Sequence, residues 1–123
     1  METAVMDAMA TEQTLILRVD VAREPGQAVV VAVGEIDASV VNIFREALLQ
    51  AVAFQEPVVV VDLSQVTYMD SGSIYALLDT WKSTGRRTDG ICLRLGNSAA
   101  TRVVETIGLH RLMTVERAGE IAN

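Results

Sequence analysis

The sequence of 123 residues is poor in the residue types that build most catalytic and metal sites. It contains a single cysteine, Cys92, and a single histidine, His110. One cysteine excludes an internal disulfide, and a lone histidine near the end of the chain leaves no Cys/His cluster for zinc and no convincing general base. A Gly-x-Ser-x-Gly elbow and a glycine-rich phosphate loop are also missing. We therefore expect no enzymatic activity, no metal and no cofactor.

Positive charge is scarce too, because 16 acidic residues face 10 basic ones and give a formal net charge of −6. The longest basic run consists of Arg86 and Arg87, so the field around the protein repels nucleic acid and anionic lipid. No apolar run approaches the ~20 residues of a membrane-spanning helix. We expect a cytoplasmic protein with no nucleic-acid partner and no membrane insertion.

Hydrophobic periodicity predicts strands and helices in alternation. Period-two patterns and short β-branched runs predict the strands, and apolar residues at helical spacing predict the helices. In chain order we expect strands at 15–21 and 28–33, a helix at 40–52, a strand at 58–61, a helix between Asp70 and Gly85, a strand at 91–95, a helix between Ser98 and Gly108, and a strand at 112–115. The tail from Glu116 has room for one more helical turn.

This order predicts an α/β fold with a mixed sheet of four to five strands and with helices packed mainly on one face, because right-handed crossovers place successive helices on the same side. Asp37 or Ser39 is the expected N-cap of the first helix. Residues 1–13 lack a sustained period and are expected to form a flexible arm, and residues 14–123 to form a single domain.

The segment 58–78 is the most informative part of the chain. A buried strand there leads through Asp70, Ser71, Gly72 and Ser73 into an amphipathic helix. Unpaired backbone N–H groups and the positive end of the helix dipole make such a turn suited to an anion, for example a phosphorylated serine. An ordinary structural role is the alternative, in which Asp70 and Ser71 cap the helix and Gly72 relaxes the tight turn.

Three separated segments together resemble the STAS domain of bacterial anti-sigma factor antagonists. They are VGEID at 33–37, VVDLSQVTYMDS at 60–71, and LGNS at 95–98 with the apolar positions 103–104 and 107–109. The first is similar to the family's turn before the first helix, the second to the strand and loop that carry its regulatory serine, and the third to its last strand and helix. The resemblance extends from about Leu15 to Val115.

The resemblance implies a STAS fold and a protein that works by binding. Such a protein engages an anti-sigma factor kinase, frees a sigma factor, and is switched off by phosphorylation of a serine or threonine at the start of the second helix. The usual motif is Asp-Ser-Ser/Thr-Gly, whereas Gly72 occupies the acceptor position here. Ser71 as a relocated acceptor, Ser73 as a relocated acceptor, and no phosphorylation all stay open, and we favour the last.

Further residues are expected on the surface around this turn. Loops at the carboxyl ends of neighbouring parallel strands converge, which places Asp37 near Asp70. The expected partner-binding residues are Asp37, Asp70, Ser71, Gly72 and Ser73, with Tyr75, Asp79 and Lys82 on the outward face of the second helix. The same resemblance implies an alternative role, an accessory subunit that docks onto a transporter ATPase, and Gly72 favours it because that role uses no phosphoserine.

Overall fold

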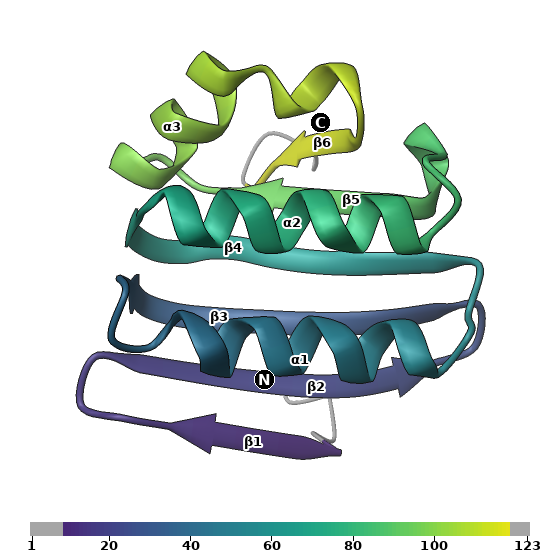
Figure 1. The fold of residues 1–123 in the computed structure, drawn as a ribbon, viewed down its shortest axis with the longest axis horizontal. Coiled ribbons are helices and arrows are strands. Elements are labelled where there is room, and N and C mark those ends of the chain that lie inside the picture. Colours follow the sequence, from purple (N-terminus) through teal and green to yellow (C-terminus); the bar gives the residue numbers. More distant parts are fainter. Residues whose placement is uncertain (1–8, 119–123) are drawn as a thin grey trace.

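The computed structural model describes residues 9–118, and these form six β-strands, three α-helices and two short 3-10 helices (Figure 1). The strands are β1 (Ala10–Gln13), β2 (Leu17–Glu24), β3 (Gln27–Ile36), β4 (Val58–Met69), β5 (Ile91–Leu95) and β6 (Thr114–Arg117). The helices are α1 (Val41–Ala53), α2 (Ser71–Ser83) and α3 (Ala99–Ile107), and the 3-10 helices are η1 (Thr88–Gly90) and η2 (Leu109–Arg111).

The strands lie in the sheet in the order of the chain, from β1 at one edge to β6 at the other. The first three strands pair antiparallel and the last four pair parallel. The expected mixed sheet is confirmed, but it has six strands rather than four to five. The additional strand β1 lies within the expected arm, of which residues 1–8 are outside the described residues. Its sequence, ATEQ, carries no apolar alternation because only Ala10 is partly buried, and the three residues after it are exposed at the sheet edge.

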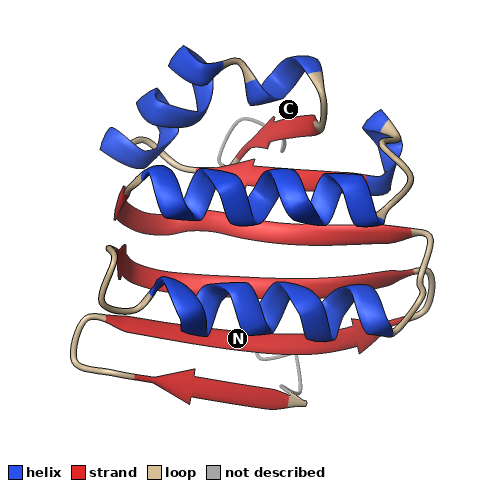
Figure 2. Ribbon diagram, viewed as in Figure 1, coloured by secondary structure: helices blue, strands red, loops and turns tan. Residues whose placement is uncertain are grey.

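Helices α1 and α2 lie side by side across one face of the sheet, and α3 packs beyond them at the end of β4 (Figures 1 and 2). The core fills the space between the helices and the sheet. Phe44 of α1 and Leu77 of α2 are buried there together with Val30 of β3 and Val61 of β4. Burial of each such side chain stabilises the fold by roughly 1.5–3 kcal/mol. The predicted arrangement, with helices mainly on one face, is therefore confirmed.

Strand β4 is longer than its apolar pattern indicates. It continues past Val61 to Met69, and the residues that it buries beyond this point, Leu63, Val66 and Met69, are three residues apart instead of two. The pairing register between β3 and β4 shifts at two places, which explains the broken alternation. As a result β4 leads into α2 through the single residue Asp70.

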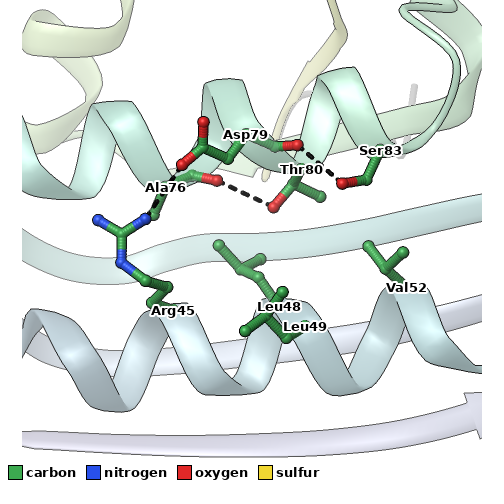
Figure 3. Close-up of a pocket in the computed structure, with 8 residues that line it drawn as sticks. All are labelled: Arg45, Leu48, Leu49, Val52, Ala76, Asp79, Thr80 and Ser83. Carbon is green, nitrogen blue, oxygen red and sulfur yellow. Dashed lines mark hydrogen bonds and ion pairs between the residues drawn. The ribbon is translucent and has the colours of Figure 1, made fainter.

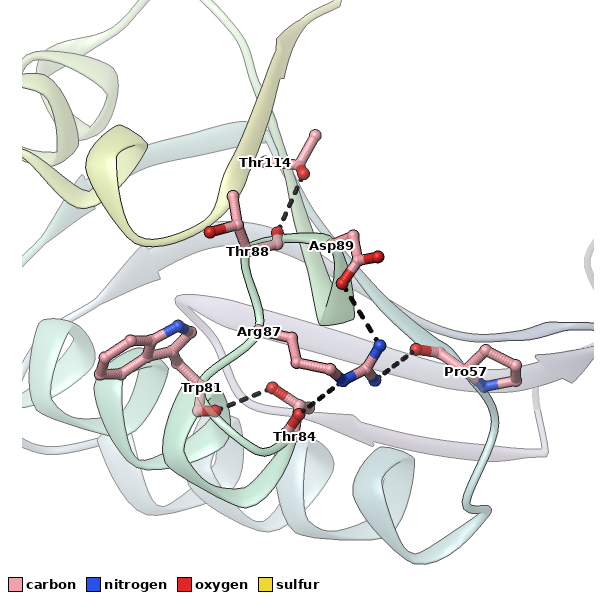
Figure 4. A network of polar contacts seen from close by, with 7 residues as sticks. All are labelled: Pro57, Trp81, Thr84, Arg87, Thr88, Asp89 and Thr114. Atoms are coloured by element: carbon pink, nitrogen blue, oxygen red, sulfur yellow. Dashed lines mark hydrogen bonds and ion pairs between the residues drawn. The ribbon is translucent and has the colours of Figure 1, made fainter.

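At the end of the molecule opposite to the β4–α2 junction, Arg87 links several segments. It lies in the connection between α2 and β5. Its guanidinium donates hydrogen bonds to the carbonyl oxygens of Thr84 and Pro57, both at 3.1 Å, and to the Asp89 carboxylate at 3.3 Å (Figure 4). Arg87 thereby joins the end of α2 to the start of β4. In the tail, Glu116 and Arg117 belong to β6, and the rest of the segment in which one more helical turn is expected, residues 119–123, lies outside the described residues.

Candidate functional site

Two strand-to-helix turns meet where β3 and β4 end. Ile36 and Met69 are neighbours in register at these ends, and the backbone N–H of Asp70 donates to the Ile36 carbonyl oxygen at 3.2 Å. The turn after Ile36 contains Asp37 and leads to α1, and the turn after Met69 contains Asp70 and leads to α2 (Figure 1). The structure thus brings the two turns to the same end of the sheet.

Asp70 is the N-cap of α2. Its Oδ1 atom accepts hydrogen bonds from the backbone N–H groups of Gly72 at 3.1 Å and Ser73 at 3.4 Å. Such a cap stabilises a helix by about 1 kcal/mol, and its negative charge interacts favourably with the helix dipole. The internal carboxylate already occupies the helix N-terminus. The turn is therefore less suited to an external anion than its sequence indicates.

The two candidate serine acceptors differ in accessibility. Ser71 is exposed in the first turn of α2, whereas Ser73 is completely buried and its Oγ donates to the Ile36 carbonyl oxygen at 3.3 Å. The expectation that Ser73 lies on the partner-binding surface is wrong for that reason. Ser73 precedes the buried Leu77 by four residues. This helical spacing puts both residues on one face of α2, so the sequence itself indicates that Ser73 is buried.

The backbone conformation at position 72 does not require a glycine. It lies in the first turn of α2 with φ outside the left-handed region. A Cβ at this position would lie 3.3 Å from Asp70 Oδ1 and 3.4 Å from Val41 Cγ2. These contacts are tight, but both neighbours are side-chain atoms that can shift by a few tenths of an ångström. The backbone of the turn is therefore compatible with a serine, and the interpretation that glycine relaxes the turn is not supported.

Asp37 does not cap α1, and neither does Ser39. The Asp37 Oδ1 atom accepts hydrogen bonds from the Ser39 backbone N–H at 2.9 Å and from the Ser39 Oγ at 2.6 Å. The N-cap of α1 is Val40, which offers no side-chain hydrogen bond, so the predicted cap is wrong. The hydroxyl and then the N–H of Ser39 stabilise the carboxylate and lower the pKa of Asp37. Asp37 therefore carries a negative charge beside the Asp70 turn.

The outward face of α2 presents the remaining expected residues to solvent. Tyr75 is 64% exposed, and Asp79 and Lys82 are exposed as well. Asp79 Oδ2 forms an ion pair with Arg45 Nη1 of α1 at 3.2 Å (Figure 3). Exposed pairs of this kind contribute about 0–1 kcal/mol. The pair is thus free to exchange for contacts with a partner.

A groove with a volume of about 160 Å³ lies between α1 and α2 (Figure 3). Leu48, Leu49 and Val52 supply its apolar wall from α1. On the α2 side, the hydroxyls of Thr80 and Ser83 donate to carbonyl oxygens of their own helix at 2.9 and 3.0 Å. The groove therefore offers mainly apolar contacts. The apolar spacing over residues 40–52 does not single out Leu49, although Leu48 and Leu49 are adjacent and cannot both point into the core.

Between residues 9 and 118, no three His, Cys, Asp or Glu side chains lie close enough together to hold a metal ion. Over the same range, none of the helices has the length and apolar character needed to cross a membrane. What the turns and α2 provide is an exposed surface with charged, aromatic and apolar groups, which suits contact with another protein.

A protein-family model described as "Mlab, STAS domain" matches residues 19–115 of the chain. Among curated proteins, none matches its sequence. An anti-sigma factor antagonist from Mycobacterium paratuberculosis has a similar structure, with a TM-score of 0.73 and 26% identity over 80% of this chain and 84% of that chain.

The anti-sigma factor antagonist SpoIIAA has the same fold. Its unphosphorylated form gives a TM-score of 0.66 and 18% identity, over 83% of this chain and 89% of that chain. The phosphorylated form of SpoIIAA, from Bacillus, gives 0.60 and 17%, over 83% and 92%.

Proposed function

Because this chain belongs to the STAS domain family, we propose that it is an anti-sigma factor antagonist, which binds an anti-sigma factor and so frees a sigma factor for transcription. The observation that carries the proposal is the likeness to the antagonist from Mycobacterium paratuberculosis, which extends over 80% of this chain at 26% identity. In this role the protein works in the cytoplasm by binding alone and catalyses no reaction.

The proposed partner is an anti-sigma factor of the serine kinase type, and its binding surface is the end of the sheet together with the outward face of α2. Asp37 and Asp70 supply negative charge there, and Ser71 and Gly72 allow close approach to the helix N-terminus. Tyr75 is the one large aromatic side chain exposed on α2, and tyrosines at the centre of an interface often contribute much of the binding energy. An interface of standard size would bury about 1,200–2,000 Å².

We propose further that phosphorylation of this turn does not switch the protein. Gly72 has no hydroxyl, and Ser73 is buried. Ser71 is accessible, but a phosphate on it would add about −1.5 to −2 charge units next to the Asp70 carboxylate that already caps the helix. The like charges repel, which makes the phosphorylated turn unfavourable.

Co-purification from the cells that encode the protein tests the proposed partner. We expect the tagged protein to retain an anti-sigma factor, identified by mass spectrometry. Tyr75→Ser should raise the dissociation constant for that partner about tenfold. The matched control is Tyr68→Ser, which removes another exposed tyrosine from the opposite face of the sheet and should leave this affinity unchanged. Recovery of a transporter ATPase without any anti-sigma factor would overturn the proposal.

A transporter ATPase is the second candidate partner, and one observation favours it. Gly72 removes the phosphoacceptor that an antagonist controlled by a kinase requires, whereas docking onto an ATPase needs no acceptor. The same co-purification distinguishes the two roles, since it identifies the bound protein directly.

Incubation with the co-purified kinase and ATP tests the proposal that phosphorylation does not switch the protein. We expect no phosphate on the wild-type protein, and phosphate on residue 72 of Gly72→Ser, because the backbone there accommodates a side chain. Mass spectrometry locates the modification, and circular dichroism confirms that the variant is folded. Phosphate on Ser71 or Ser73 of the wild-type protein would contradict the proposal.

A further inference from the structure

Exposed apolar side chains gather at one corner of the sheet. Among residues 9–118, eight large hydrophobic side chains are exposed, and four of them come from this corner. Leu15 and Ile16 belong to the connection between β1 and β2, Val33 to β3 and Tyr68 to β4. Tyr68 is 47% exposed and Leu15 is fully exposed. Clusters of this kind on a soluble protein are typical of interaction sites.

The pairing of the strands places these residues side by side. The backbone N–H of Glu35 donates to the Ile16 carbonyl oxygen at 2.9 Å, and Glu35 is the register partner of Tyr68. Arg18 is the register partner of Val33 on the neighbouring strand. Ile16, just before β2, therefore lies in one row with Glu35 of β3 and Tyr68 of β4, and Arg18 and Val33 lie in the next row.

The cluster lies on the face of the sheet that is turned away from α1 and α2. Leu17, Ile36 and Met69 are buried in the core beneath the helices, and so is Ala32. Side chains alternate between the faces of a sheet. Ile16, Glu35 and Tyr68 each directly precede one of the first three buried residues, so they point to the other face. Val33, which follows Ala32, points there as well. The cluster is thus separate from the outward face of α2.

The charges on the cluster have both signs. Arg18 and Glu35 are exposed on two adjacent rows and flank Val33 and Tyr68. Arg18 has one ion-pair partner in its own strand, Asp20 at 3.3 Å, and its side chain is still 48% exposed. A partner whose contact surface carries charges of only one sign would place a like charge against either Arg18 or Glu35. A second copy of the same surface can be placed by a two-fold axis that passes between Arg18 and Glu35, so that Arg18 of each copy faces Glu35 of the other.

We propose that the protein forms a weak symmetric dimer through this cluster, with Ile16, Val33 and Tyr68 at its centre and reciprocal ion pairs between Arg18 and Glu35 of the two copies. The apolar area is small, so the surface buried in the dimer falls at the low end of the range for protein–protein interfaces, below about 1,200 Å². A dissociation constant between about 10 μM and about 1 mM is expected. The dimer leaves α2 and the Asp70 turn open, and it does not depend on the proposed function.

Sedimentation equilibrium between about 10 μM and about 1 mM protein tests the proposal. The mean mass should rise from monomer towards dimer across this range, and Tyr68→Ser should raise the dissociation constant of the dimer about tenfold. The matched control is Tyr75→Ser, which removes a more exposed tyrosine from α2 and should leave the dimer unchanged. A monomer at every concentration would overturn the proposal, and so would a dimer that Tyr68→Ser does not weaken.

A charge exchange supplies a second, independent measurement. Arg18→Glu and Glu35→Arg should each weaken the dimer several-fold, because each places two like charges together, and the variant with both changes should recover most of the lost affinity. Val33→Thr, which keeps the shape of the strand residue, replaces Tyr68→Ser if that variant does not fold. A double variant no tighter than the single variants would exclude the reciprocal ion pairs and with them the proposed dimer.

Discussion

The two strand-to-helix turns contain the same residue types and use them differently. In the β4–α2 turn, Asp70 directly precedes the helix, and its carboxylate accepts two of the free N–H groups. In the β3–α1 turn, Asp37 lies four residues before the helix and bonds to Ser39 instead, so α1 begins without a side-chain cap. The distance of each aspartate from the helix start therefore decides whether it stabilises the helix or only its own loop.

Two glycines near these turns, Gly34 within β3 and Gly72 in the first turn of α2, differ in a similar way. Gly34, at the end of β3, has a φ of +117°, and a Cβ on it would lie 2.0 Å from the Ile16 carbonyl oxygen. Gly72, at the start of α2, has ordinary helical backbone, and the nearest atoms belong to side chains. The first glycine is required by the fold. The second is not, because its backbone is helical and its nearest neighbours are side-chain atoms that can shift.

Substitution of the glycines gives the largest expected effect. Gly34→Ala should destabilise the protein by about 3 kcal/mol or more, because its φ of +117° disfavours alanine and the backbone at Ile16 must move away from the new methyl group. The matched change Gly72→Ala should alter the free energy of unfolding by less than about 1 kcal/mol. Urea unfolding followed by circular dichroism measures both. Similar losses for the two variants would mean that the two glycine positions do not differ in this respect.

Substitution of the aspartates gives an intermediate effect. Asp70→Ala removes the acceptor for two N–H groups of α2 and should cost about 1–2 kcal/mol of folding stability, whereas Asp70→Asn should retain most of the cap. Asp37→Ala should cost less, since no helix depends on it. The same unfolding experiment compares the three variants. An Asp37→Ala loss as large as that of Asp70→Ala would contradict the assignment of the caps.

The smallest expected effect concerns the ionisation of Asp37. NMR titration should place the pKa of its carboxyl below the ordinary aspartate value, and Ser39→Ala should raise this pKa because the bonded hydroxyl is lost. The folded-state pKa is lower than the unfolded one, so the charged group favours the folded state above the unfolded pKa. This contribution is lost as the pH falls through the folded pKa. An unchanged titration in Ser39→Ala would show that the hydroxyl has no such role.

Local patterns were sufficient to predict the elements that carry a strong period. The apolar spacing over residues 40–52 predicted α1 within one residue at either end, and the alternation of Ile91, Leu93 and Leu95 predicted β5. Local patterns failed where the secondary structure depends on pairing between segments that are distant in the sequence. The ATEQ segment forms β1 only because β2 offers an edge, and the second half of β4 is hidden by register shifts that interrupt its alternation.

The candidate site was predictable in part for the same reason. The position of Asp70 directly before an amphipathic segment indicated a cap, and the structure shows one. The burial of Ser73 follows from its helical spacing to Leu77. The exposure of Tyr68 was not predictable, because it depends on the register shift that turns Met69 into the core and leaves its neighbour on the opposite face.

The turn between β2 and β3 lies at the end of the molecule opposite to both strand-to-helix turns, beside the Pro57 segment that Arg87 holds in place. Pro25 and Gly26 are exposed there, but Gly26 has a φ of +86°, so a label belongs on Pro25 and not on Gly26. This turn is therefore the natural attachment point for a fluorophore or for immobilisation on a sensor chip. A molecule anchored there presents the Asp70 turn, α2 and the Tyr68 row to solution, where their binding partners can be measured separately.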